Sequence, residues 1–109
     1  MNSVEYTLSY LPLFYDDLEE HILYISDFLC NKTAANDLLD AIESAILKRL
    51  PNAESFEPYH SKKDRKYPYY RIYVKDYTIY YVVIPNVPGK KTMEVRRILH
   101  NLQNRNKYI

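Results

Sequence analysis

The sequence predicts an α+β fold, in which a small antiparallel sheet is packed on one face by an α-hairpin. Two apolar stripes with helical spacing lie within residues 16–50, and three β-type segments follow within residues 69–99. A further short β-type segment, VEYTL, precedes both helices. The predicted order is therefore β-α-α-β-β-β with a short C-terminal helical tail, and residues 1–109 are expected to form one domain.

The two predicted helices follow from apolar residues that recur at helical spacing. The stripe of the first helix consists of Leu18, Ile22, Ile25 and Leu29. Asp16 precedes this stripe, where acids favour a helix N-terminus, and the helix is expected to end near Cys30. Asn31 and its neighbours offer caps for the second helix, which Pro51 ends. So short a connection predicts an antiparallel helical hairpin.

A long loop and three strands are predicted for the second half of the chain. Residues 52–68 show no clear period and contain the basic cluster HSKKDRK, which is typical of a loop. The segments YYRIYV, YTIYYVVI and TMEVRRIL are rich in β-branched and aromatic residues and predict strands. The middle segment is apolar on both faces, so we expect it to be central in the sheet.

Composition excludes several classes of protein and of site. Cys30 is the only cysteine and Gly89 the only glycine, which excludes an internal disulfide and a glycine-rich phosphate loop. No apolar run is long enough to span a membrane, and the N-terminus lacks the basic region of a secretory signal. No spacing of His, Asp and Glu suggests a metal site. We therefore expect a cytoplasmic protein without membrane contact, metal or cofactor.

Charge divides the chain into an acidic and a basic half. Residues 1–58 carry a net charge of −8, and residues 59–109 carry a net charge of +9. This polarity predicts acidic helices on one side of the sheet and a basic surface suited to an anionic partner on the other. Mutual neutralisation of the two halves is the alternative.

Basic and aromatic residues of the second half are candidates for contact with RNA, since phosphates need cations and unpaired bases need flat rings. The tyrosines expected to be outward or terminal are Tyr69, Tyr73, Tyr80 and Tyr108. The candidate RNA- or ribosome-binding residues are Lys62, Lys63, Arg65, Lys66, Tyr80, Arg105 and Lys107. An ordinary solvated loop and ordinary strand-forming tyrosines remain the alternative.

His100, at the end of the last predicted strand, is the candidate for proton transfer, because imidazole titrates near neutral pH. Arg97 and Arg105 lie near it in the sequence and are suited to stabilising a negatively charged transition state. His21 and Cys30 are expected to be structural.

In their order and spacing these segments resemble the RelE/ParE superfamily of toxins from bacterial type II toxin–antitoxin (plasmid stabilization) systems. The resemblance covers nearly the whole chain and rests on YTLSYLPLFYDDLEEHILYI, AANDLLDAIESAILKRLPN, YYRIYVKDYTIYYVV and EVRRILHNLQNRNKY. It implies the fold predicted above and a cognate antitoxin protein as partner. It also implies one of two activities: metal-independent cleavage of mRNA on the ribosome, or inhibition of DNA gyrase without catalysis.

For the first activity, an mRNA interferase, the resemblance implies His100, which matches a histidine near the end of many members, as acid or base. From the basic face of the sheet we expect Arg71 and Arg97 to hold the phosphate. Tyr108 or Tyr80 would then stack a base. Thr78 departs from the family, because RNA-cleaving members commonly carry an arginine directly after the first tyrosine of this strand. A threonine cannot neutralise a phosphate, so gyrase inhibition and an inactive toxin retained as a binding partner stay open.

Overall fold

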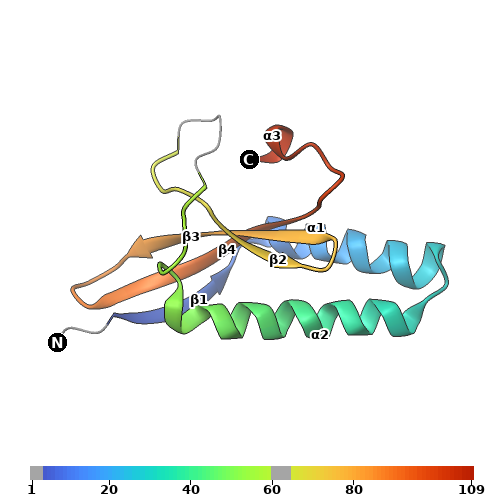
Figure 1. Cartoon of the computed structure of the whole chain (residues 1–109), viewed down its shortest axis with the longest axis horizontal. Coiled ribbons are helices and arrows are strands. Elements are labelled where there is room, and N and C mark those ends of the chain that lie inside the picture. The colour runs from blue at the N-terminus through green and yellow to red at the C-terminus, as the bar shows by residue number, and fades with distance from the viewer. Residues whose placement is uncertain (1–3, 60–64) are drawn as a thin grey trace.

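The computed structural model describes residues 4–59 and 65–109. Within them, two long helices cover one face of a four-stranded sheet (Figure 1). In chain order the main elements are β1 (Glu5–Tyr10), α1 (Pro12–Leu23), α2 (Lys32–Arg49), β2 (Tyr70–Val74), β3 (Tyr77–Pro85), β4 (Lys90–His100) and α3 (Arg105–Tyr108). The predicted α+β class, the order of elements and the helical tail are confirmed.

The strand order β1-β4-β3-β2 places the first and last strands side by side. β3 is antiparallel to both of its neighbours, β2 and β4. β1 is instead parallel to β4, with a register that ends at the pair Tyr10↔Val95. The sheet is therefore antiparallel over β2, β3 and β4, and β1 is its parallel edge strand.

α1 begins at Pro12, four residues before the predicted acidic start. Proline fits the first turn of a helix, because the N–H that it lacks would have no partner there. After Leu23 the chain forms a π-helical turn, η1 (Tyr24–Phe28), before the hairpin reverses. Asn31 caps α2 as expected, since its Oδ1 accepts the N–H of Ala34 at 3.0 Å. The 3₁₀ turn η2 (Leu50–Asn52) ends α2 at the predicted proline.

Apolar side chains fill both faces of the sheet. The face toward α1 and α2 carries the larger core, in which Phe14, Leu38 and Ile46 pack against strand residues such as Ile79. The opposite face, called the outer face below, carries a second cluster formed by Tyr69, Tyr80, Val82, Leu99 and Ile109. In Figure 1 α3 lies on the side of the sheet away from α2.

The expectation that Tyr69 and Tyr80 face outward into solvent is wrong. Both side chains are 3% exposed. They point to the outer face as their strand positions predict, but the C-terminal tail and Tyr59 pack over them. Tyr73, in contrast, is 65% exposed, as expected for an outward position near the end of β2.

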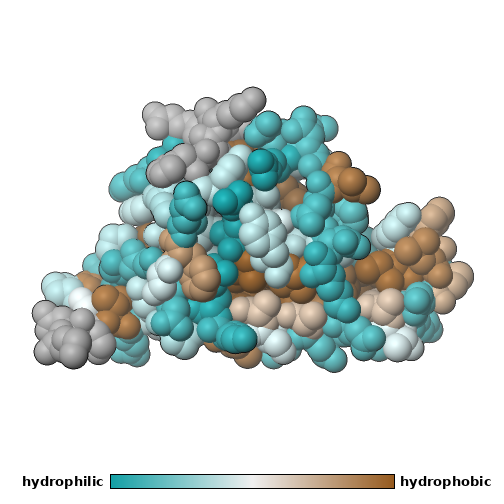
Figure 2. All heavy atoms as spheres, in the orientation of Figure 1, coloured by the Kyte–Doolittle hydropathy of each residue, from teal (hydrophilic) through white to brown (hydrophobic). Residues whose placement is uncertain are grey.

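Surface character differs along the molecule. Figure 2 shows mostly hydrophilic residues over α3, and apolar residues at the end where the helical hairpin turns. Three of the exposed apolar side chains at this hairpin end are Leu23, Phe28 and Leu29. No helix within residues 4–59 and 65–109 has the length and apolar character needed to cross a membrane.

Candidate functional site

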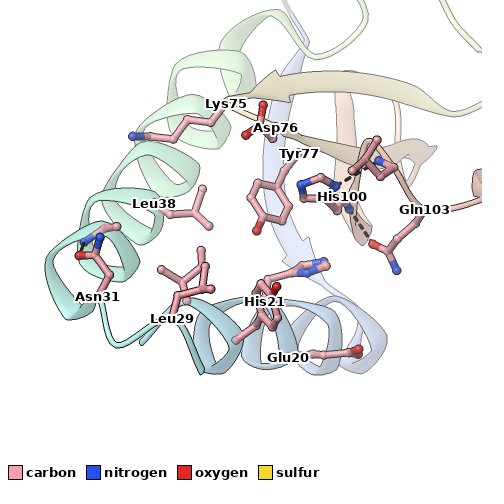
Figure 3. Close-up of a pocket in the computed structure, with 14 residues that line it drawn as sticks. Glu20, His21, Leu29, Asn31, Leu38, Lys75, Asp76, Tyr77, His100 and Gln103 are labelled. Atoms are coloured by element: carbon pink, nitrogen blue, oxygen red, sulfur yellow. Dashed lines mark hydrogen bonds between the residues drawn. The ribbon is translucent and has the colours of Figure 1, made fainter. Parts of the chain in front are cut away.

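Two pockets meet at the end of the sheet where β4 stops. The hairpin pocket, of about 680 Å³, lies between the helical hairpin and the sheet (Figure 3). The outer pocket, of about 180 Å³, lies on the outer face. His100 and Gln103 line both pockets. The described residues that line the outer pocket are Tyr73, Thr78, Tyr80, Leu99, His100, Asn101, Gln103 and Arg105.

His100 is half-buried and its ring lies on the helix side of the sheet. It pairs with Tyr77 in the β3–β4 register, and paired residues share a face. The two rings meet edge to face, with their centroids 5.0 Å apart, and the Tyr77 ring also contacts His21 at 4.8 Å. Figure 3 shows the imidazole beside Tyr77 at the wall of the hairpin pocket. The candidate imidazole is therefore accessible from a pocket rather than sealed in the core.

Hydrogen bonds within residues 100–103 fix the tautomer of His100. The N–H of Leu102 donates to Nδ1 at 3.1 Å, and the N–H of His100 itself donates to Oε1 of Gln103 at 2.6 Å. A ring nitrogen that accepts a hydrogen bond carries no proton, so the neutral ring carries its proton on Nε2. Nε2–H is then the group that His100 offers to a ligand.

Arg71 and Arg105 lie together on the outer face. Their guanidinium carbons are 4.7 and 5.1 Å from the centroid of the Tyr59 ring. Burial raises the pKa of the Tyr80 hydroxyl, while the charge of Arg105 and its hydrogen bond with Tyr80 oppose this rise. These two arginines therefore concentrate positive charge beside the outer pocket, on the opposite side of the sheet from the imidazole of His100.

Arg97 is engaged away from the outer pocket. Its Nε and one terminal nitrogen donate to the two carboxylate oxygens of Asp17 at 2.7 and 2.8 Å. The hydrogen bond with Asp17 is the main cause that raises the pKa of Arg97, and burial opposes it. The guanidinium carbon also lies 5.0 Å from the Tyr108 ring centroid. The structure thus places Arg97 and Tyr108, two predicted catalytic residues, in a contact that joins the tail to α1.

α1 also completes the edge of β4 beyond the end of β1. Oδ2 of Asp17 accepts the N–H of Ile98 at 3.1 Å, and Nε2 of His21 donates to the carbonyl oxygen of Ile98 at 2.8 Å. His21 is structural, as the sequence predicted. The role of Asp17 was missed, although its i, i+4 spacing to His21 places both on one helix face.

Thr78, which stands at the position of the family arginine, is buried. Its side chain is 4% exposed, and its hydroxyl donates to Oδ1 of Asn101 at 2.7 Å. Sequence reasoning did not single out Asn101 or Gln103, because nothing local in NLQN indicates that their amides face a pocket.

The remaining candidate cations flank the tail. Arg65 lies 5.6 Å from the Tyr69 ring centroid and donates to the carbonyl oxygen of Ile109 at 3.5 Å. Lys66 and Lys107 lie against the rings of their tyrosine neighbours, at 5.4 and 5.8 Å. Lys62 and Lys63 lie outside the described residues. No group of three His, Cys, Asp or Glu side chains in the described ranges is arranged to hold a metal ion.

Comparison with known families identifies the chain more closely. A family model described as ParE toxin of type II toxin-antitoxin system, parDE, matches residues 8–105. The match runs from β1 to the start of α3 and includes both pockets. No curated protein matches the chain.

Proposed function

We propose that this chain, which belongs to the ParE toxin family and is the toxin of a type II toxin–antitoxin system, stops growth by cleaving mRNA on the ribosome. Family membership also gives it an antitoxin protein as partner. Cleavage and gyrase inhibition are the two activities known within the RelE/ParE superfamily, and the proposal chooses between them from the site.

The outer pocket carries this proposal. Arg105 and the exposed ring of Tyr73 line it, and His100 stands where this pocket meets the hairpin pocket. A cation for a phosphate, a flat ring for an unstacked base and an imidazole N–H are the groups that metal-free cleavage of RNA uses. Sequence positions 73, 100 and 105 are brought to one end of the sheet only by the fold.

In the proposed reaction the 2′-hydroxyl of one nucleotide attacks its own 3′-phosphate. The bond from phosphorus to the next 5′-oxygen breaks, and the products are a 2′,3′-cyclic phosphate and a free 5′-hydroxyl. Water takes the proton of the attacking hydroxyl and returns one to the leaving oxygen. The guanidinium of Arg105 approaches the phosphate from the outer face, and Nε2–H of His100 approaches it from the end of β4, where the two pockets meet. Both groups stabilise the negative charge that develops on the phosphate. His100 then acts as a hydrogen-bond donor rather than as the acid or base expected from the sequence.

Other candidate residues take modified roles. Arg71 adds to the positive field beside Arg105, and Arg65, Lys66, Lys107 and the two loop lysines, Lys62 and Lys63, contact the ribosomal RNA backbone. Tyr73 stacks a base in place of Tyr80, whose ring is buried. Arg97 and Tyr108 hold the tail in place.

Gyrase inhibition is the second candidate, and two observations favour it. The imidazole of His100 lies on the helix side of the sheet, whereas Arg71 and Arg105 lie on the outer face, and Thr78 stands where RNA-cleaving relatives carry arginine. A toxin that acts by binding alone does not need these groups to converge on one phosphate.

Purified toxin added to translating ribosomes tests the proposal by toeprinting. We expect new mRNA ends at the ribosomal A site, and a mixture with free mRNA should show none. Intact message, together with loss of DNA supercoiling by purified gyrase, would instead support the second candidate. A toxin that is harmless when expressed without antitoxin would reject both.

A further inference from the structure

We infer that the outer pocket is a phosphate-binding site whose donors are side-chain amides held in one orientation by the protein. Asn101 and Gln103, together with Arg105, supply the hydrogen bonds and the charge that the missing strand arginine would supply. The inference that this site holds the scissile phosphate rests on the proposed function. The inference that it binds an anion is tested without measuring cleavage.

Thr78 determines which end of the Asn101 amide is free. A threonine hydroxyl has one proton, and here it donates to Oδ1 of Asn101 at 2.7 Å from a buried position. The N–H of Asn101 is also bound, to the carbonyl oxygen of Asp76 at 2.8 Å. With the backbone fixed and Oδ1 occupied, the NH₂ group is the end that Asn101 presents to a ligand.

The side-chain amide of Gln103 is held in the same way, with its oxygen bound inside the protein. Its Oε1 accepts the N–H of His100 at 2.6 Å, and its own N–H donates to the carbonyl oxygen of His100 at 2.9 Å. Within residues 4–59 and 65–109 its NH₂ group has no hydrogen bond, so this end is again available to a ligand. Two amides whose oxygens are used internally therefore line a single small pocket with their donors available.

Charge in the pocket suits an anion. Arg105 lines it, and among its described lining residues none is Asp or Glu. Donors fixed before binding stabilise an oxyanion better than mobile ones, because no reorganisation is needed when the ligand arrives. The volume of about 180 Å³ admits a phosphate group, and Tyr73 at its edge offers a ring to an attached base.

The test is a titration of ¹⁵N-labelled toxin followed by NMR of the side-chain amides. The ligands are inorganic phosphate, acetate as a second oxyanion, and a short RNA with one internal phosphodiester. We expect the Asn101 and Gln103 NH₂ signals to shift with phosphate and with RNA, and tighter binding for RNA because of Tyr73. Binding of inorganic phosphate alone would identify a free-phosphate site and reject the RNA phosphate as its ligand.

Asn101→Asp is the decisive variant, because it keeps an acceptor for Thr78 and replaces the NH₂ donor with a negatively charged oxygen. We expect phosphate binding to weaken by about tenfold or more. Asn106→Asp is the matched control, since it adds the same charge to an exposed residue of α3 that does not line the pocket. Equal weakening by both variants would show a general charge effect and overturn the inference, as would unchanged binding by Asn101→Asp.

The two proposals fail separately. If the native toxin binds phosphate through Asn101 but leaves mRNA intact on the ribosome, cleavage is rejected and the anion site stands. If the native toxin cleaves mRNA and Asn101→Asp cleaves at the same rate, the scissile phosphate does not bind in the outer pocket, and cleavage stands.

Discussion

The carboxylate of Asp17 holds the guanidinium of Arg97 by two parallel hydrogen bonds and so joins α1 to β4. Both side chains are mostly buried, 11% exposed for Asp17 and 15% for Arg97. Asp17 also accepts the N–H of Ile98, a β4 group that lies beyond the last pair with β1. On the other side of Arg97 lies the ring of Tyr108. One ion pair thus connects the first helix, the sheet edge and the C-terminal tail.

Arg97→Ala should destabilise the fold strongly, because it leaves the Asp17 carboxylate buried without its partner. Removing one member of a buried ion pair costs about 3–5 kcal/mol, and the residual exposure of this pair favours the lower end. Urea unfolding followed by circular dichroism measures the change. The double variant with Asp17→Ala should lose less than the sum of the two single losses, because the residues interact directly.

Arg96→Ala is the control for this prediction. Its partner Glu94 lies on the same strand, and both are half-buried, so the loss should be under about 1 kcal/mol. An Arg97→Ala protein as stable as the native one would mean that the guanidinium is free for another role, such as holding a phosphate.

The positions of helices and strands could be predicted because their periodicities are local. Ile22 and Ile25 share a helix face through their spacing alone, and the alternation around Ile72 does the same for β2. The start of α1 at Pro12 was missed because the acids at 16 and 17 also fit a helix start. In the structure, the carboxylate of Asp17 instead accepts the N–H of Ile98 at the edge of β4.

The site could be predicted only in part, because its contacts join residues far apart in the chain. The outward direction of Tyr80 follows from its strand position, but its burial depends on a tail that begins about twenty residues later. The bond between Thr78 and Asn101 likewise requires the β3–β4 register. His100 could be singled out from the sequence because few other side chains can transfer protons near neutral pH. Amide side chains such as that of Gln103 are common, and nothing in the local sequence marks them as part of a site.

Stability should fall between pH 10 and pH 12 because of Tyr6. Its hydroxyl donates to Glu54 at 2.8 Å, and burial together with this bond raises its pKa from 10.0 to about 12. A pKa that is higher in the folded state stabilises the fold below pH 10, and the contribution is lost as the pH rises through the folded value.

The Tyr6 prediction is checked by measuring the free energy of unfolding across this pH range. Tyr6→Phe should remove this part of the alkaline slope, since phenylalanine has no proton to lose. Glu54→Gln keeps the acceptor but removes its charge, so it should reduce the slope partially. A slope unchanged in Tyr6→Phe would assign the alkaline loss to other tyrosines.

Lys75→Gly should stabilise the β2–β3 turn. Lys75 has a φ of 52°, in the left-handed region where a side chain is strained by about 1–2 kcal/mol. Glycine relieves this strain, but its larger conformational entropy in the unfolded chain offsets part of the stabilisation. We therefore expect the free energy of unfolding in urea to increase by about 0.5–1 kcal/mol. Asp76→Gly, at the neighbouring turn position without a left-handed φ, is the control and should be destabilising. A loss of stability in Lys75→Gly would show that its side chain contributes more than its backbone costs.

His100→Gln and His100→Ala should separate hydrogen bonding from proton transfer. A glutamine amide can donate as Nε2–H does, and its oxygen can accept the Leu102 N–H that Nδ1 now accepts. If His100 stabilises the phosphate as a donor, His100→Gln should retain cleavage within about tenfold, whereas His100→Ala should lose about 10²–10³-fold, as for other oxyanion donors. Single-turnover cleavage of mRNA on programmed ribosomes measures both rates. Equal loss in the two variants would indicate proton transfer instead, because neither side chain titrates, and full toxicity in both would indicate a toxin that does not cut RNA.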